Sequence, residues 1–204
     1  TDHTTYGLVC SELSEDLSKT NLGELELDSF QKNSVKIKIK AASLNFPDLL
    51  MTQGKYQNKP NLPFALGMEG AGIVEKIGSE VSSLKEGDEV MFGGWGHGAI
   101  AESIILPEGL VSLKPKSLNF SEAASFKTAY LTAYVGLIRR GELRQGETLL
   151  VHGASGGVGM AAVQMGKLYG ARVIASGTSD EKLKIVKTWG ADEIINTGLE
   201  GAVS

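Results

Sequence analysis

A run of small residues near the middle of the chain has the spacing of a turn that holds a pyrophosphate. The stretch LLVHGASGGVGMAAVQMGK, residues 149–167, passes from a short apolar segment through ASGGVG into a segment of helical periodicity. Ala154, Gly156 and Gly159 stand where the pattern G-x-G-x-x-G has its three glycines. The first position allows a tight turn off a strand, the second a close approach of backbone to phosphate, and the third close packing of helix on strand. The residues predicted to hold the phosphates are Ala154, Ser155, Gly156, Gly157, Val158 and Gly159.

The context of this turn favours a ligand over an empty glycine-rich loop, which is the alternative. A strand is expected before the turn and a helix after it, from about Val158 to Tyr169. The unpaired N–H groups and the positive dipole end of that helix would face the phosphates. Ala154 departs from the usual first glycine, and it is tolerable if its φ angle is negative.

The end of the second strand indicates which dinucleotide is preferred. NAD sites commonly carry Asp or Glu there to bond the ribose 2′-hydroxyl, whereas this chain reads VIASGTSDEKLK, with no carboxylate at the strand end. Hydroxyl groups are available there, and Lys182 offers a positive charge for a 2′-phosphate, although a merely solvated lysine is the alternative. We therefore predict NADP(H) as the cofactor, bound at its adenosine end by Ser176, Gly177, Thr178 and Lys182.

Alternating strands and helices around the turn indicate a parallel sheet. Helices are predicted over residues 121–141, with Ser121 as a plausible N-cap. Strands are then expected at 148–152, 171–176 and 193–195, and helices at about 158–169 and 180–189. These βαβ units predict the half of a doubly wound sheet that has the strand order 3-2-1.

The first part of the chain is rich in short strands. SVKIKIKAA, residues 34–42, alternates apolar residues with lysines and predicts a strand with one buried face. GAGIVEKIG (70–78) and AIAESIIL (99–106) predict further strands, with EGDEVMF between them, and LNFPDLLMTQG (44–54) predicts a short helix with Pro47 in its first turn. Many short strands separated by glycine and proline turns indicate a small, partly open barrel.

Composition and charge argue against several classes of protein. The net charge of −4, without a long run of one sign, gives no indication of a nucleic-acid surface. No apolar stretch approaches the ~20 residues of a membrane span, and the polar start TDHTTYG is no signal peptide. The single cysteine, Cys10, excludes an internal disulfide and fits a reducing compartment. A cytoplasmic protein is therefore expected.

Several segments together resemble the medium-chain dehydrogenases/reductases, in their zinc-independent quinone oxidoreductase (zeta-crystallin-like) branch. They are LNFPDLLMTQGKY, LPFALGMEGAGIVEKIG, EGDEV, GAIAE, AYLTAY and GETLLVHGASGGVGMAAVQMGK, in the family's order. The resemblance implies an α/β fold with a GroES-like, partly open β-barrel domain, assigned to residues 1–124. A Rossmann NADP(H)-binding domain, truncated here, follows at residues 125–204, and the substrate would lie in the cleft between the two. A homodimer is implied for full-length members.

The resemblance also implies roles for three residues. Tyr56 matches the tyrosine that acts as a donor in the family's enoyl reductases, Asn45 an asparagine near the nicotinamide ribose, and Thr132 a threonine beside the nicotinamide. The implied reaction is hydride transfer from NADPH to a quinone, an enone or an enoyl thioester. A surface aromatic at Tyr56 and a packing residue at Thr132 are the alternatives, and Asp48 is expected to cap the short helix.

A catalytic zinc is not expected. Zinc-dependent relatives have a Cys near the NFPD position and a His in the motif G-H-E, where this chain has Asn45 and Met68. Neither side chain supplies a thiolate or an imidazole. His97 alone makes no metal site, and His152 ends a strand that we expect to be buried.

The predicted sheet has three of the six strands of a complete Rossmann domain, so its first strand, with the apolar LLV, would lie at an open edge. The chain is then either a fragment or truncated form of a longer reductase, or a short protein with another task. The competing function is a non-catalytic NADPH-binding homologue that serves as a sensor, scaffold or structural protein. If the chain is complete, we expect weak NADPH binding at most and little turnover.

Overall fold

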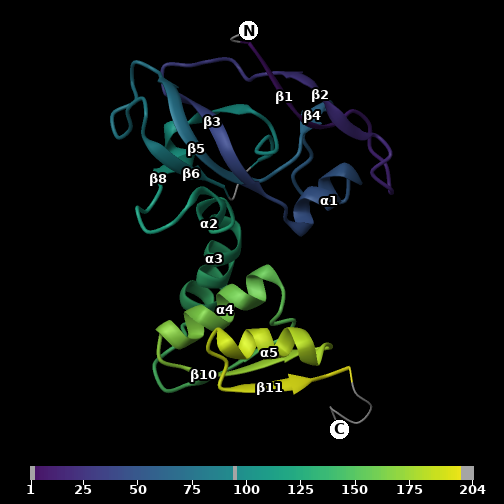
Figure 1. Cartoon of the computed structure of the whole chain (residues 1–204), viewed down its shortest axis with the longest axis vertical. Coiled ribbons are helices and arrows are strands. Elements are labelled where there is room, and N and C mark those ends of the chain that lie inside the picture. Colours follow the sequence, from purple (N-terminus) through teal and green to yellow (C-terminus); the bar gives the residue numbers. More distant parts are fainter. Residues whose placement is uncertain (1–2, 94–95, 199–204) are drawn as a thin grey trace. The chain divides into compact units, whose positions relative to one another are not determined.

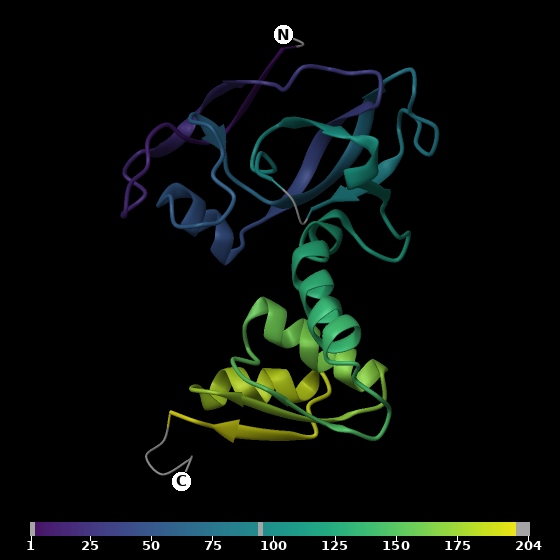
Figure 2. The same ribbon diagram turned by 180° about the vertical axis from the view of Figure 1, so that it is seen from behind.

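The computed structural model describes residues 3–93 and 96–198 of the chain (Figure 1). The chain divides into two compact units, Thr1–Thr128 and Ala129–Ser204, called unit 1 and unit 2 below. Unit 1 runs from purple to teal and unit 2 from green to yellow in the ribbon seen from behind (Figure 2). Within the residues described, no helix is long and apolar enough to cross a membrane.

Unit 1 is built from two antiparallel sheets. The smaller sheet has the order β2-β1-β4, from β1 (Thr4–Cys10), β2 (Thr20–Glu26) and β4 (Phe64–Ala65). The larger has the order β7-β3-β5-β6-β8, from β3 (Ser34–Ser43), β5 (Glu69–Ile77), β6 (Glu89–Phe92), β7 (Ser103–Pro107) and, after a 3-10 turn at Glu108–Leu110, β8 (Val111–Leu113). The curled larger sheet is the GroES-like barrel that the resemblance implied, so the fold predicted for the first part of the chain is confirmed.

The local patterns in unit 1 explain how its elements form. In β3, Val35 and Ile37 are fully buried while Lys38 and Lys40 are exposed, as the alternation predicted. The predicted short helix is α1 (Phe46–Thr52), and Pro47 lies in its first turn, where its missing N–H costs no helical bond.

The strand predicted at 99–106 begins later than expected. Only β7, from Ser103, pairs with β3, because the preceding residues bond to the smaller sheet instead. The Leu8 N–H donates to the Ile100 carbonyl at 2.9 Å, and the Ile100 N–H donates to the Leu66 carbonyl at 2.8 Å. This segment therefore crosses from one sheet to the other before it becomes a strand.

The prediction of Ser121 as an N-cap is wrong. The first helix after the barrel strands is α2 (Phe120–Ala124), and its N-cap is Asn119. The Glu122 N–H donates to Asn119 Oδ1 at 2.9 Å, and the Asn119 N–H donates to Glu122 Oε2 at 2.8 Å. This reciprocal capping box satisfies two donors at once, and it places Ser121 inside the helix. The next helix, α3 (Lys127–Tyr134), continues into a π-helical segment, Val135–Arg140.

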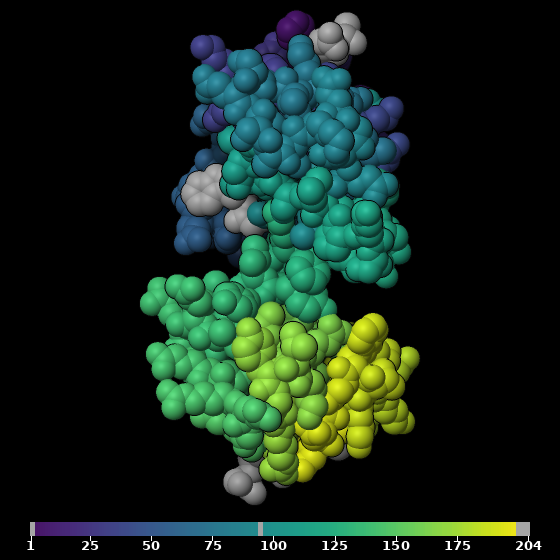
Figure 3. All heavy atoms as spheres, turned by 90° about the vertical axis from the view of Figure 1, so that its left-hand side faces the viewer, coloured from purple at the N-terminus to yellow at the C-terminus, as the bar shows by residue number. Residues whose placement is uncertain are grey.

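Unit 2 is a three-stranded parallel sheet in the predicted order. Its strands are β9 (Thr148–Val151), β10 (Arg172–Gly177) and β11 (Glu193–Asn196), ordered β11-β10-β9. Helices α4 (Gly157–Leu168) and α5 (Asp180–Thr188) both cover one face of this sheet (Figures 1 and 2). The yellow-green residues that include α4 and the yellow residues that include α5 lie side by side on one surface of the unit (Figure 3). As predicted, β9 lies at an edge, and its Leu150 is 48% exposed.

The two candidate caps of α2 give a direct test. Asn119→Ala should lower the free energy of unfolding by about 1 kcal/mol, because it removes the side chain that accepts from the Glu122 N–H. Ser121→Ala is the matched control and should change stability little, since alanine is a better helix former. The measurement is chemical denaturation followed by circular dichroism, and a larger loss for Ser121→Ala would contradict the assignment.

Candidate functional site

The turn after β9 has the shape that the glycine spacing predicted, with its tightest point one residue earlier. Gly153 has a φ of +61°, a conformation that glycine adopts without strain. Ala154 has no positive φ, as its identity requires, and it is fully buried. Its N–H donates to the Ser176 carbonyl at 3.0 Å, which ties the turn to the end of β10. Gly153 was not singled out in the sequence, although its position before the pattern marks the turn.

Gly159 has a packing reason to be glycine. A Cβ at Gly159 would lie 2.4 Å from the Gly153 carbonyl oxygen and 2.7 Å from the Ala154 Cα, both of them backbone atoms. The start of α4 therefore lies directly against the turn, as expected for the third glycine of the pattern.

No contact within the chain requires glycine at positions 156 and 157. A Cβ at Gly156 would meet only the Gly153 carbonyl oxygen, at an ordinary 3.5 Å, and a Cβ at Gly157 would meet nothing within 4 Å. Gly156 is the N-cap of α4 and supplies no side-chain hydrogen bond to the helix. The first N–H groups of α4 thus face an open cradle without a side-chain acceptor, which is the arrangement that fits a pyrophosphate.

The end of β10 carries the residues predicted for the adenosine end. Ser176 is buried, and its Oγ lies 2.9 Å from His152 Nδ1 and 3.5 Å from the Val151 carbonyl oxygen, so its hydroxyl is engaged within the unit. His152 has the predicted hydrogen bond but is exposed, not buried, because it follows an edge strand. Thr178 is exposed next to Gly177.

Lys182 lies in the first turn of α5. Ser179 caps that helix by accepting the Lys182 N–H at 3.4 Å, and the Lys182 side chain is exposed with no ion pair to another described residue. The carboxylate of Asp180, in the same turn, accepts from Asn196 Nδ2 at 2.7 Å. β10 itself, RVIASG, ends without a carboxylate.

Thr132 lies on α3 and is exposed. Two residues before it, the Tyr130 hydroxyl donates to Gln164 Oε1 of α4. This bond joins α3 to the helix that carries the cradle, so Thr132 and residues 154–159 belong to one unit.

The other two predicted site residues flank α1 in unit 1. Asn45 is the N-cap of α1, and its side chain donates from Nδ2 to Glu69 Oε1 at 2.9 Å. Tyr56 is half-buried four residues after α1, and its ring packs against the cluster of Cys10, Met51, Phe64, Leu66 and Met68. Tyr56 is therefore not a loosely attached surface aromatic.

Asp48 binds backbone donors on both sides of α1. Its Oδ2 accepts the Asn45 N–H at 2.7 Å, as the predicted cap, and its Oδ1 accepts the Gly67 N–H at 3.1 Å. Burial raises the pKa of the Asp48 carboxyl, the two N–H bonds oppose that rise, and repulsion from Glu69 adds to it. Two buried carboxylates thus hold the start of α1, and Glu69 was not recognised from the sequence.

Residues 31–116 match the family model described as the alcohol dehydrogenase GroES-like domain, and residues 157–204 match the one described as zinc-binding dehydrogenase. The chain is 36% identical, over 190 residues, to the quinone oxidoreductase-like protein 2 homolog of Nematostella vectensis, covering 93% of this chain and 51% of that protein. It is 41% identical, over 176 residues, to 2-methylene-furan-3-one reductase of Solanum lycopersicum, and the match covers 81% of this chain and 45% of that protein. The crystal structure of a quinone oxidoreductase from Pseudomonas syringae pv. Tomato superposes with a TM-score of 0.88 at 34% identity, covering 96% of this chain and 60% of that one.

The chain belongs to the medium-chain dehydrogenase/reductase family. Within this family of oxidoreductases it is similar to the quinone oxidoreductases. The chain spans about half the length of the curated relatives it matches.

In this medium-chain dehydrogenase/reductase, the positions of the zinc ligands of other members hold different groups. Met68 is buried among apolar side chains, and Asn45 is bonded to Glu69. Over residues 3–93 and 96–198, no group of three or more His, Cys, Asp or Glu side chains is placed to hold a metal ion.

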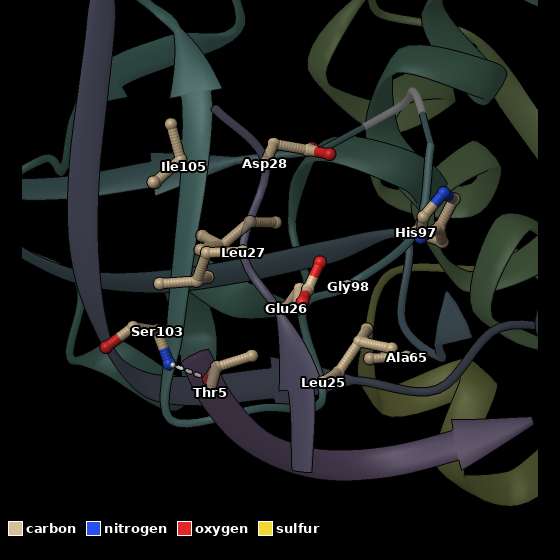
Figure 4. A pocket seen from close by; sticks show the side chains of 11 residues that line it. Thr5, Leu25, Glu26, Leu27, Asp28, Ala65, His97, Gly98, Ser103 and Ile105 are labelled. Atoms are coloured by element: carbon tan, nitrogen blue, oxygen red, sulfur yellow. Dashed lines mark hydrogen bonds between the residues drawn. The ribbon is translucent and has the colours of Figure 1, made fainter. Parts of the chain in front are cut away.

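His97 lies at a small pocket of about 50 Å³ (Figure 4). Its ring packs against Phe64 with the centroids 5.4 Å apart, and burial lowers the pKa of the imidazole while Asp28 opposes this effect. Figure 4 also shows the Ser103 N–H donating to Thr5 Oγ1, at 3.0 Å. The pocket is far smaller than the roughly 300 Å³ of a typical ligand site, and His97 also lines a second, open hollow of about 1030 Å³.

The glycines of the cradle differ in a way that stability measurements can resolve. Gly159→Ala should lower the free energy of unfolding by about 1–3 kcal/mol, because the new methyl group collides with backbone. Gly157→Ala is the matched control, two residues away in the same helix, and should be neutral or stabilising because its methyl group meets open space. Thermal unfolding measures both variants, and equal losses would contradict the packing described.

Proposed function

We propose that the chain is the cofactor-binding and substrate-binding part of a zinc-independent, NADPH-dependent oxidoreductase that reduces quinones or α,β-unsaturated carbonyls. The observation that carries the proposal is the open cradle at the start of α4, where Gly156 and Gly157 are free of contacts that would require glycine. A bound pyrophosphate would explain glycine at these two positions, because a side chain there would collide with the ligand and not with the protein.

The preference for NADPH over NADH rests on the end of β10. Lys182 is an exposed cation in the first turn of α5, with no ion pair to another described residue, and Thr178 offers an exposed hydroxyl directly after β10. Asp180 and Glu181 lie in the same turn of α5, and the Asp180 carboxylate is held by Asn196. A 2′-phosphate would pair its negative charge with the Lys182 ammonium group.

The residues proposed for the nicotinamide end are Asn45, Tyr56 and Thr132. When bound, NADPH supplies a hydride to the acceptor, and negative charge then develops on the acceptor oxygen. The Tyr56 hydroxyl would donate to that oxygen, and the packing of its ring against the buried cluster would hold the donor in place. Asn45 would hold the nicotinamide ribose through its amide.

The names of the similar proteins support this class of acceptor. One is called a quinone oxidoreductase and another a reductase of 2-methylene-furan-3-one, which contains a carbon–carbon double bond conjugated to a ketone. Zinc independence is supported by the donors at the two key positions, a thioether and an amide, which are poor zinc ligands.

The second candidate is a homologue that binds NADPH without reducing an acceptor. Two measurements separate the reductase from the homologue that only binds NADPH. They are a titration with NADPH and an assay of NADPH oxidation over a panel of quinones, enones and enoyl thioesters. Binding without oxidation of NADPH by any acceptor would favour the second candidate, and no binding would remove both.

Lys182→Ala tests the choice of nucleotide. The variant should bind NADPH about tenfold more weakly, from the loss of one charge contact, and should bind NADH as before. Lys184→Ala, which removes another exposed lysine of α5, is the matched control. Equal losses for the two nucleotides in a fluorescence titration would refute the preference.

Tyr56→Phe tests the proposed donor. Removal of the hydroxyl should lower the rate of NADPH oxidation by about 10²-fold and leave the affinity for NADPH unchanged, because the ring still fills its place in the cluster. A single-turnover assay with enzyme in excess measures the rate. An unchanged rate at saturating NADPH would remove Tyr56 from the mechanism.

A further inference from the structure

Glu69 is a buried carboxylate with a distinct donor on each oxygen. It lies at the start of β5 and is 1% exposed. Its Oε1 accepts from Asn45 Nδ2 at 2.9 Å, and its Oε2 accepts from the Thr128 N–H, in the first turn of α3, at 2.8 Å. The stem of the side chain is closely packed as well, because a Cβ at Gly93 would lie 2.5 Å from Glu69 Cβ. The hydrogen bonds to both oxygens and the close packing of the stem therefore hold the Glu69 carboxylate in a single orientation.

A carboxylate held in this way decides which end of the Asn45 amide faces outward. A carboxylate accepts hydrogen bonds and an Asn amide has one donor end and one acceptor end, so Asn45 must turn its NH2 group toward Glu69. The Asn45 backbone is held independently, by its N–H bond to Asp48 Oδ2 at 2.7 Å. The carbonyl end, Oδ1, faces the Asp48 N–H in the capping box of α1, and its second lone pair is the part of the amide left for a ligand.

Packing alone does not explain a carboxylate at this position. Burial of a charge costs several kcal/mol, and a neutral side chain of similar size would usually fill the space at lower cost. A neutral amide, however, offers only one acceptor end, whereas Asn45 Nδ2 and the Thr128 N–H both need an acceptor.

We propose that Glu69 is a positioning residue, which fixes the Asn45 amide so that Oδ1 is presented as an acceptor to a hydroxyl of the nicotinamide ribose. The proposal rests on the function proposed above, in which Asn45 holds that ribose. Glu69 itself touches no ligand and acts through Asn45.

Glu69→Gln should reverse the orientation of the Asn45 side-chain amide. The Gln NH2 group must face one of the two donors, and the Thr128 N–H is part of the backbone and cannot turn away. The Gln oxygen will therefore stay with Thr128, its NH2 group will face Asn45, and Asn45 will turn its carbonyl inward. The variant would then present the ribose with a donor in place of an acceptor.

The first experiment follows the Asn45 side-chain NH2 signal in ¹⁵N-labelled full chain, assigned by its loss in Asn45→Ala. In the wild type its hydrogens should exchange slowly with water, and in Glu69→Gln at least about tenfold faster, because the NH2 group leaves a buried partner. Glu75→Gln, an exposed glutamate of the same strand, is the control and should leave the signal unchanged. Fast exchange in the wild type overturns the proposal even if Glu69→Gln does not fold, and so does unchanged exchange in a folded Glu69→Gln.

The second experiment is a double-mutant cycle on NADPH affinity. Glu69→Gln and Asn45→Ala should each weaken binding by about tenfold, and the double variant should bind no more weakly than Asn45→Ala alone. Losses that multiply would mean that Glu69 acts independently of Asn45, which overturns the proposal. A wild type that binds no NADPH refutes the proposed function instead, and amide exchange still decides whether Glu69 orients Asn45.

Discussion

Unit 2 depends on two glycines, Gly159 and Gly166, at which α4 comes close to the turn and the sheet beneath it. At the start of the helix, a Cβ on Gly159 would overlap the backbone of the preceding turn, and further along, a Cβ on Gly166 would lie 2.7 Å from Leu149 Cδ2 and 2.9 Å from Val173 Cγ2. The helix therefore rests directly on β9 and β10. Because two points fix a line, these contacts set the direction of the helix axis, and with it the direction in which its first N–H groups point.

Bonds from the last turn of α4 to the loop between α5 and β11 preserve this arrangement. Lys167 Nζ lies 2.8 Å from Asp192 Oδ2, which in turn accepts the Val173 N–H. Hydrogen bonds to Lys167 and Val173 lower the pKa of the Asp192 carboxyl. The Asp192 carboxylate thus joins the last turn of α4 to the central strand β10, directly before β11. These bonds hold the helix whose other end carries the cradle.

In unit 1, two buried carboxylates, Asp48 and Glu69, hold the polar residue Asn45 in place. Asp48 and Glu69 are both about 1% exposed, and each accepts N–H groups with both of its oxygens. These bonds offset the cost of burying two like charges close together. Their common neighbour is Asn45, which is held through its backbone by one carboxylate and through its side chain by the other.

Local sequence patterns were enough to predict the helices and strands and the chemistry of the glycine turn. The alternation in β3 and the βαβ spacing of unit 2 are local patterns, since they follow from which residues must be buried in a strand or a helix. The glycine spacing around Gly159 predicted the cradle for the same reason, because each position has a local steric requirement. The limits of α2 were less visible, since Asn119 and Ser121 are both good caps and the choice depended on Glu122 reaching back to Asn119.

The surroundings of these helices and strands could not be predicted from local patterns and became known from the fold. Glu69 follows Met68 in a segment that looks like the start of a strand, and nothing local shows that its two oxygens meet Asn45, 24 residues earlier, and Thr128, 59 residues later. His152 was expected to be buried because its strand is apolar, yet it is exposed, since burial depends on which strands lie beside β9. Local periodicity reports the face that a residue occupies, whereas burial and hydrogen-bond partners are set by segments far away in the chain, and these are known only once the chain has folded.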